Sequence, residues 1–258
     1  MRSLLFSVIA VIALAGASAA QAQRGQAPQP AATARAAAPV DLTGVWVSLV
    51  TNEWRWRMLT PEKGDYAVLP INAEARRIAD TWDPAKDEAS GEQCKGYGAA
   101  AIMQMPARLR VAWDNDNTLR MDIDTGTQTR LFRFGPPQPA AGTPTWQGNS
   151  AAEWQVARGR GQEGHPTVPA TPPARNGTLK VVTTQMRPGY LRRNGVPYSA
   201  NTTVTEYFTR ITDGGATYLN VTVIVEDPLY LTQPYVRSMQ FRREPNASKW
   251  DPTPCSAR

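Results

Sequence analysis

Histidine and cysteine are almost absent from this sequence. Its 258 residues include one histidine, His165, and two cysteines, Cys94 and Cys255. A Ser-His-Asp triad or a Cys-His pair would have to use His165, and a metal site built from several histidines is impossible. No glycine-rich loop of the kind that cradles a phosphate occurs either. We therefore expect neither a bound metal nor a cofactor.

Charge is also scarce. Lys, Arg, Asp and Glu make up 19% of the chain, and the formal net charge is +6. So small a basic excess is not typical of a nucleic-acid-binding protein, and we expect no nucleic-acid partner. Aromatic residues are plentiful by contrast, with 8 Trp, 8 Tyr and 5 Phe. They exclude disorder throughout, because such side chains build cores.

The N-terminus has the pattern of an export signal. Arg2 precedes an apolar run over residues 4–16, which is too short to span a membrane, and Ala20-Gln21-Ala22 supplies a small-x-small cleavage pattern. We predict a signal peptide over residues 1–22, a periplasmic or secreted mature protein, and no membrane span; the alternative is an uncleaved anchor. Residues 23–40, rich in Ala, Pro and Gln, predict a disordered leader, and residues 41–258 a single domain.

Export changes the interpretation of the two cysteines. In an oxidising compartment an even number of cysteines usually pairs, so we predict a Cys94–Cys255 disulfide. Closing a loop of about 160 residues would stabilise the fold by about 4–5 kcal/mol in the chain-entropy model. The alternative is two free thiols.

Apolar residues alternate with polar ones at short spacing along most of the domain, which is typical of half-buried strands. A helix is predicted over residues 72–82, opened by an Asn72 cap, and a second short helix over 97–103. The absence of a βαβ rhythm predicts a mostly β protein, an antiparallel meander closed as a β-barrel. The predicted strands are 42–50, 54–60, 109–113, 119–123, 127–134, 146–156, 178–186, 202–211, 217–226 and 235–243.

The first strand carries Gly44-Val45-Trp46, a G-x-W motif that resembles the lipocalin or wider calycin family. The resemblance implies a barrel plugged at one end by Trp46, packed against a basic residue of the last strand, Arg237 or Arg242. Most of the domain also resembles a group of uncharacterised secreted bacterial proteins, a likeness that implies no activity. The stretches that carry it include Cys94, Met105-Pro106, Trp146 to Ser150, Thr205 to Phe208, Glu226-Asp227-Pro228 and Cys255.

Strand parity singles out Glu206. The Asp213-Gly214-Gly215 hairpin turn sets it roughly opposite Val221, on the apolar face of the sheet, and the same parity turns Arg237 inward. Arg130 is a third inward candidate. Three interpretations are open: a polar floor of a ligand cavity with Glu206 as anchor or general base, a buried ion pair that braces the barrel, or a register error that leaves these charges solvated.

Aromatic side chains form a second group of candidates for ligand binding: Trp56, Tyr190, Tyr198 and Tyr207. They line a pocket for a flat or hydrophobic ligand in one interpretation and belong to ordinary core or rim in the other. The basic, aromatic segment 187–198 is predicted to be a lid or recognition loop, or else a plain surface loop. Its arginines favour anionic groups.

Three functions fit these observations. The first is a periplasmic or secreted β-barrel that binds a small hydrophobic or amphipathic, possibly anionic, ligand. The second is a cofactor-free lyase, isomerase or hydrolase that uses Glu206 with Arg and Tyr partners. The third is an envelope interaction module without a cavity. An open cavity beside Glu206 would favour the first two, and a filled core the third.

Overall fold

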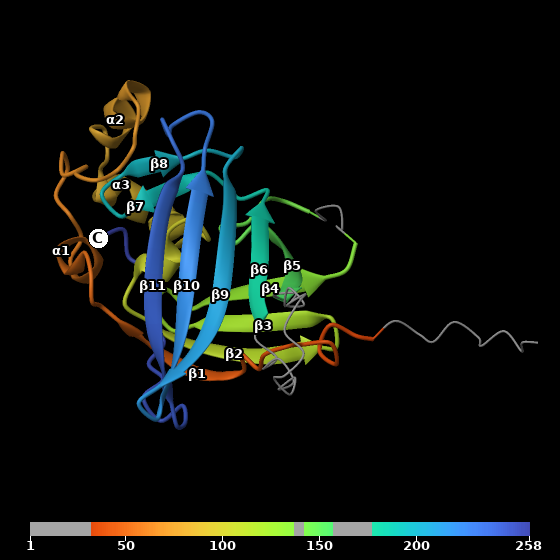
Figure 1. Cartoon of the computed structure of the whole chain (residues 1–258). Coiled ribbons are helices and arrows are strands. Elements are labelled where there is room, and N and C mark those ends of the chain that lie inside the picture. Colours follow the sequence, from red (N-terminus) through yellow and green to blue (C-terminus); the bar gives the residue numbers. More distant parts are fainter. Residues whose placement is uncertain (1–31, 137–141, 157–176) are drawn as a thin grey trace, which may run out of the picture. The chain divides into compact units, whose positions relative to one another are not determined.

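The computed structural model describes residues 32–136, 142–156 and 177–258 (Figure 1). Within them, nine strands form a closed barrel in the order β1-β11-β10-β9-β6-β5-β4-β3-β2. The prediction of a mostly β, closed barrel is confirmed. The predicted signal peptide and the loop that holds His165 lie outside the described residues. The strands are β1 Gly44–Leu49, β2 Arg108–Asn115, β3 Thr118–Ile123, β4 Gln128–Phe134, β5 Asn149–Val156, β6 Gly177–Thr184, β9 Thr203–Asp213, β10 Ala216–Glu226 and β11 Tyr235–Glu244.

The barrel is mixed, so the prediction of a pure antiparallel meander is wrong. β4 and β5 run parallel and pair through only three positions, from Phe132↔Ser150 to Phe134↔Ala152. Parallel pairing needs a connection longer than a tight turn, and residues 135–148 separate β4 from β5 in the chain. A second departure follows β6, which pairs with β9 because β7 (Gly189–Arg192) and β8 (Val196–Tyr198) form a separate hairpin.

The interior of the barrel is filled by side chains. Along β10, Leu219, Val221, Val223 and Val225 point inward, and none is more than 3% exposed. Near-zero exposure means that no water-sized void adjoins these described side chains. Burial of this apolar face, at about 25 cal/mol per Å², is the main force that closes the barrel.

Trp46 of the G-x-W motif is buried in the hydrophobic core and lies beside a basic residue of the last strand. Its side chain is fully buried, and its Nε1 donates to the Leu42 carbonyl at 3.0 Å. The basic partner is Arg243, whose guanidinium lies 5.7 Å from the ring centre, and not Arg237 or Arg242. The register explains the correction, because Trp46 pairs directly with Arg243 in the β1–β11 ladder.

One segment that was predicted to be a strand is a helix in the structure. Residues 54–60, predicted as a strand, instead begin with helix α1 (Trp54–Met58). Arg57 is buried and donates to the Gln104 carbonyl at 2.9 Å and to Asn52 Oδ1 at 3.0 Å. The outward face of α1 leaves Trp54 66% exposed.

The predicted helix over 72–82 is confirmed as α2 (Ala73–Ala79), capped by Asn72 Oδ1, which accepts from the Ala75 amide at 2.9 Å. A further helix, α3 (Pro84–Ala89), follows it. Two 3₁₀ helices, η1 (Gln93–Tyr97) and η2 (Ile102–Gln104), replace the single helix expected over 97–103. No helix among the described residues is long and apolar enough to cross a membrane.

Two segments expected to be loose are held against the barrel. The 187–198 segment forms the buried β7–β8 hairpin, with Leu191, Val196 and Tyr198 at most 1% exposed, so it is not an open lid. In the predicted disordered leader, the described residues 32–40 contact the barrel. The Ala34 amide donates to Asn117 Oδ1, and Trp154 Nε1 donates to the Ala34 carbonyl, both at 2.9 Å.

Candidate functional site

Glu206 lies inside the barrel and pairs with Arg130. Arg130 Nη1 donates to Glu206 Oε1 at 2.8 Å and Nη2 donates to Oε2 at 2.5 Å, which is a bidentate arrangement. Both side chains have no exposed area. Glu206 faces Val223 rather than Val221, but a shift of two residues keeps the same face, so the predicted inward orientation is confirmed.

The pair is embedded in the core. Arg130 Nη2 also reaches Thr183 Oγ1 at 3.3 Å, and Thr183 shares a hydrogen bond of 2.8 Å with Ser150. The guanidinium lies 5.0 Å from the centre of the Phe132 ring. Both carboxylate oxygens of Glu206 are therefore engaged and closed to any solute. This geometry fits the bracing ion pair, and it contradicts the interpretation with solvated charges.

Arg237, the other proposed partner of Glu206, is not in contact with it. Its Nε instead lies 2.8 Å from Glu53 Oε2, beside the start of α1, and donates to the Tyr235 hydroxyl at 2.9 Å. The inward parity is correct, but Arg237 is the third residue of β11, and its side chain extends to Glu53 beside α1 instead of reaching Glu206.

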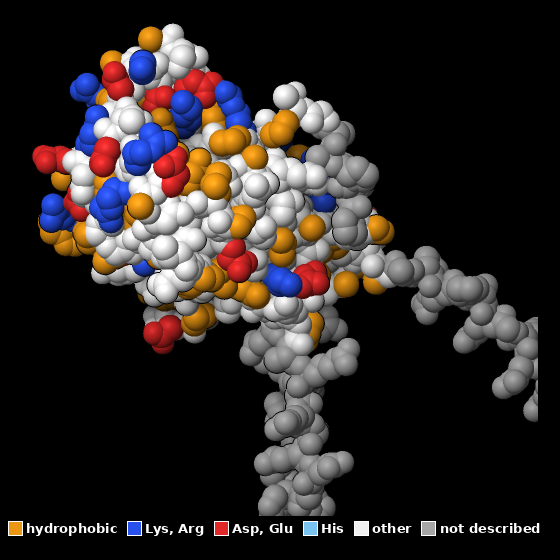
Figure 2. Space-filling model, turned by 90° about the horizontal axis from the view of Figure 1, so that it is seen from above, with side chains coloured by type: hydrophobic (Ala, Val, Ile, Leu, Met, Phe, Trp, Pro, Cys, Tyr) orange, Lys and Arg blue, Asp and Glu red, His pale blue; other side chains and the backbone are white. Residues whose placement is uncertain are grey.

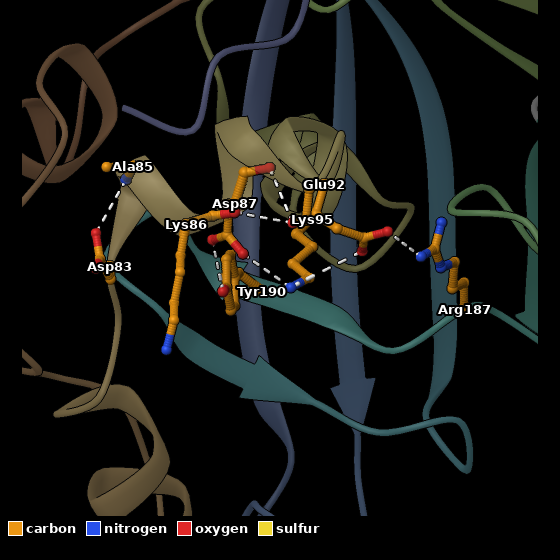
Figure 3. Close-up of polar contacts among 9 residues, drawn as sticks. Asp83, Ala85, Lys86, Asp87, Glu92, Lys95, Arg187 and Tyr190 are labelled. Carbon is orange, nitrogen blue, oxygen red and sulfur yellow. Dashed lines mark hydrogen bonds and ion pairs between the residues drawn. The ribbon is translucent and has the colours of Figure 1, made fainter.

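Tyr190 belongs to a polar network that ties α3, η1 and β7 together (Figure 3). Its hydroxyl donates to Asp87 Oδ2 at 2.7 Å, and Lys95 Nζ donates to Asp87 Oδ1 at 2.8 Å. Arg187 and Glu92 pair at the same end of the network. Burial, and then the hydrogen bond to the Asp87 carboxylate, raise the pKa of the Tyr190 phenol. Each charge in this network has a partner, which is typical of a structural clamp.

The remaining aromatic candidates do not converge on one site. Tyr198 is 1% exposed, and burial raises the pKa of its phenol. Its hydroxyl is packed so closely against Gly98 that a Cβ there would lie 2.1 Å away. Trp56 Nε1 donates to Asp65 Oδ2 at 3.0 Å, near α1. Tyr207 points outward from β9 and is partly exposed. The structure therefore brings together only Glu206 and Arg130 of the predicted site residues.

An outer groove offers a site that the sequence pattern did not identify. It has a volume of about 200 Å³ and lies across β4, β5 and β6, at the parallel seam of the barrel. Arg133 is its one charged lining residue. The other lining residues are Pro136, Asn149, Ser150, Ala151, Val182, Thr184 and Gln185.

Two backbone positions, Gln185 in the lining and Gly148 next to the lining residue Asn149, have positive φ. Gln185 has a φ of 56°, an uncommon conformation for a residue other than glycine, which is often found at functional positions. Gly148 has a φ of 58°, and a Cβ there would lie 2.5 Å from the Thr184 carbonyl oxygen, so only glycine fits. The alternation of side chains along β4 is enough to place Arg133 on the face opposite to Arg130. The groove, however, forms only where β4 and β5 pair in parallel, which the alternation does not predict.

Comparison of the chain with protein-family models, with curated protein sequences and with solved structures finds no match. The structure shows a closed barrel in which Arg243 lies over the Trp46 ring, and membership of the lipocalin family stays a prediction. Among the described residues, no three His, Cys, Asp or Glu side chains are grouped as a metal ion would need.

Proposed function

We propose that this protein is exported and binds a small anionic molecule with an apolar part, and that the binding site is the outer groove of Arg133. The observation that carries the proposal is electrostatic. Arg133 lines the groove without an acidic partner among the described residues; its one hydrogen bond is a long one of 3.4 Å to Asn149 Oδ1. A guanidinium that is free to form a bidentate contact favours a carboxylate or a similar oxyanion.

The rest of the lining matches such a ligand. Thr184 and Gln185 provide hydroxyl and amide groups at the polar side, whereas Pro136, Ala151 and Val182 provide apolar contact. A volume of about 200 Å³ lies below that of sites for drug-sized ligands, so it suits a short-chain organic acid.

We place the ligand in the outer groove and not inside the barrel, because the interior offers no space beside Glu206. The same burial weakens the enzymatic alternative, since a general base must reach its substrate within hydrogen-bond distance. A filled core agrees with an interaction module, and the groove adds a specific binding surface to that interpretation.

We expect Arg133→Gln to weaken binding of a short-chain carboxylate, such as butyrate or benzoate, by about 10- to 100-fold, because a charged hydrogen bond contributes about 1.5–3 kcal/mol. Isothermal titration calorimetry with the mature protein measures this. Arg120→Gln is the matched control, since Arg120 is an outward arginine of β3 that pairs with Asp122 instead of facing the groove. Equal affinity in both variants, or no binding of carboxylate, phosphate or sulfate by the wild type, would contradict the proposal.

The predicted cleavage of the signal peptide can be tested separately. We expect the mature chain to begin at Gln23 in the periplasmic or secreted fraction, because cleavage after Ala22 follows the small-x-small pattern. N-terminal sequencing of the fractionated protein measures this. Recovery of an intact Met1 from the envelope would show that the apolar run is retained.

A further inference from the structure

The outer face of the sheet β6-β9-β10-β11 has an unusual composition. Three consecutive cross-strand rows point outward there: Thr178↔Thr209↔Asn220↔Gln240, Lys180↔Tyr207↔Thr222↔Ser238 and Val182↔Thr205↔Ile224↔Val236. Lys180 is the one charged member, and it is paired with Glu153 at 2.9 Å. None of the three rows contains a carboxylate.

A solvent-facing sheet surface normally carries many charged side chains. On this molecule they gather elsewhere: Figure 2 shows Lys, Arg, Asp and Glu concentrated over the side that carries the helices, at the left of both views. Figure 1 shows no helix in front of β9, β10 and β11. No described helix covers this face, and apart from Lys180 its polar side chains carry hydroxyl and amide groups.

The chemistry of the face distinguishes between partners. Protein interfaces are enriched in Tyr, Trp, Phe, Met and Arg and depleted in Lys and Ser at their centres, and Tyr207 is the one residue of an enriched type in the three rows. Hydroxyl and amide groups dominate instead, and they both donate and accept hydrogen bonds. The residues that provide them are Thr205, Thr209, Asn220, Thr222, Ser238 and Gln240.

We propose that this face binds an uncharged polysaccharide, with Tyr207 as its aromatic platform and the surrounding hydroxyl and amide groups as its hydrogen-bonding partners. Tyr207 lies in the middle row, between Lys180 and Thr222. An aromatic ring offers a flat apolar surface to the C–H face of a sugar ring, and its phenol adds a polar handle. The neutral character of the face matches a polymer whose polar groups are almost all hydroxyls. Strands about 4.8 Å apart repeat these contacts across the sheet, which suits an extended chain of sugar rings.

The sheet face and the outer groove can be tested separately, because Tyr207 and Thr222, the central residues of the face, do not line the groove. Affinity electrophoresis in native gels tests it, with hydroxyethyl cellulose, xyloglucan, galactomannan or mixed-linkage β-glucan as the polymer in the gel. We expect at least one of these polymers to retard the mature protein relative to a gel without polymer. Retardation at a series of polymer concentrations gives a dissociation constant for each protein. We expect Tyr207→Ala and Thr222→Lys each to raise this dissociation constant at least tenfold.

Ala112→Lys is the matched control for Thr222→Lys, since Ala112 is an exposed outward residue of β2, away from the face, and the added charge is the same. It should retain the wild-type dissociation constant, as should Arg133→Gln, which tests the groove. The proposal is overturned if no polymer retards the wild type, or if folded Thr222→Lys is retarded like the wild type. It is also overturned if the face instead mediates self-association, seen as a concentration-dependent dimer that Thr222→Lys abolishes.

Discussion

Glu206→Leu is expected to lower the free energy of unfolding by about 3–5 kcal/mol, because it breaks the buried ion pair inside the barrel. The change removes both hydrogen bonds to Arg130, at 2.8 and 2.5 Å, and leaves that guanidinium buried without its counter-ion. An unpaired buried charge costs far more than the pair contributes. Urea unfolding of the mature protein, followed by tryptophan fluorescence, measures the loss.

Companion variants separate charge from packing. Glu206→Gln should cost less than Glu206→Leu, because the amide keeps one acceptor for Arg130. The double substitution Arg130→Met with Glu206→Leu should recover much of the loss, since replacing both partners removes the buried charge. Glu153→Gln is the surface control and should change stability by less than about 1 kcal/mol, because Glu153 is exposed. A Glu206→Leu protein as stable as the wild type would exclude a bracing role.

The place of the pair explains why the barrel needs it. The β4–β5 seam pairs at only three positions, fewer than any other neighbours in the barrel. Arg130 lies on β4, and its guanidinium reaches Glu206 on β9 and Thr183 on β6; Thr183 in turn bonds Ser150 on β5. The pair therefore links both sides of the seam through the interior. The polar cluster compensates for a short ladder rather than lining a ligand cavity.

Parity made the inward orientation of Glu206 predictable from the sequence. Side chains alternate strictly along a strand, so Val204 and Phe208 on either side place Glu206 among the apolar residues. The register was wrong by two residues because the centre of the turn lies between Gly214 and Gly215, one residue further along the chain than the predicted pairing implies. Asp213 pairs directly with Ala216, which leaves only two glycines, both with positive φ, in the turn.

Other features depended on distant contacts that a local pattern cannot contain. The alternation of residues 54–60 suits a strand, but Arg57 is buried through bonds to Asn52 and Gln104, and the second of these lies 47 residues away in the chain. The basic 187–198 segment resembles a surface loop, yet it is buried against helices from an earlier part of the chain. The outer groove exists only because β4 and β5 meet in parallel, which neither strand signals alone.

The C-terminus is held to the barrel by the predicted disulfide, which the structure contains between Cys94 and Cys255. Hydrogen bonds reinforce it on both sides: the Thr253 amide donates to the Asp124 carbonyl at 3.0 Å, and the Ala257 amide donates to Glu88 Oε1 at 2.8 Å. Cys94 lies in η1, beside the Lys95 that anchors the Asp87 and Tyr190 network. The disulfide thus fastens the last residues to the same end of the barrel that the network clamps.

Cys255→Ser is expected to lower the free energy of unfolding by about 4–5 kcal/mol, because the disulfide closes a loop of 161 residues and long loops lose the most entropy in the unfolded chain. For a domain of this size, such a loss lowers Tm by about 10 °C or more. Differential scanning calorimetry measures it, with reduced wild-type protein as the comparison.

Reduction should lower the Tm of the wild type to that of Cys255→Ser and leave the variant unchanged. A Cys94→Ser, Cys255→Ser double variant should match the single one, which would show that a lone thiol is not the cause. Alkylation without reductant should add no label to the wild type; two labels would show that the cysteines are free.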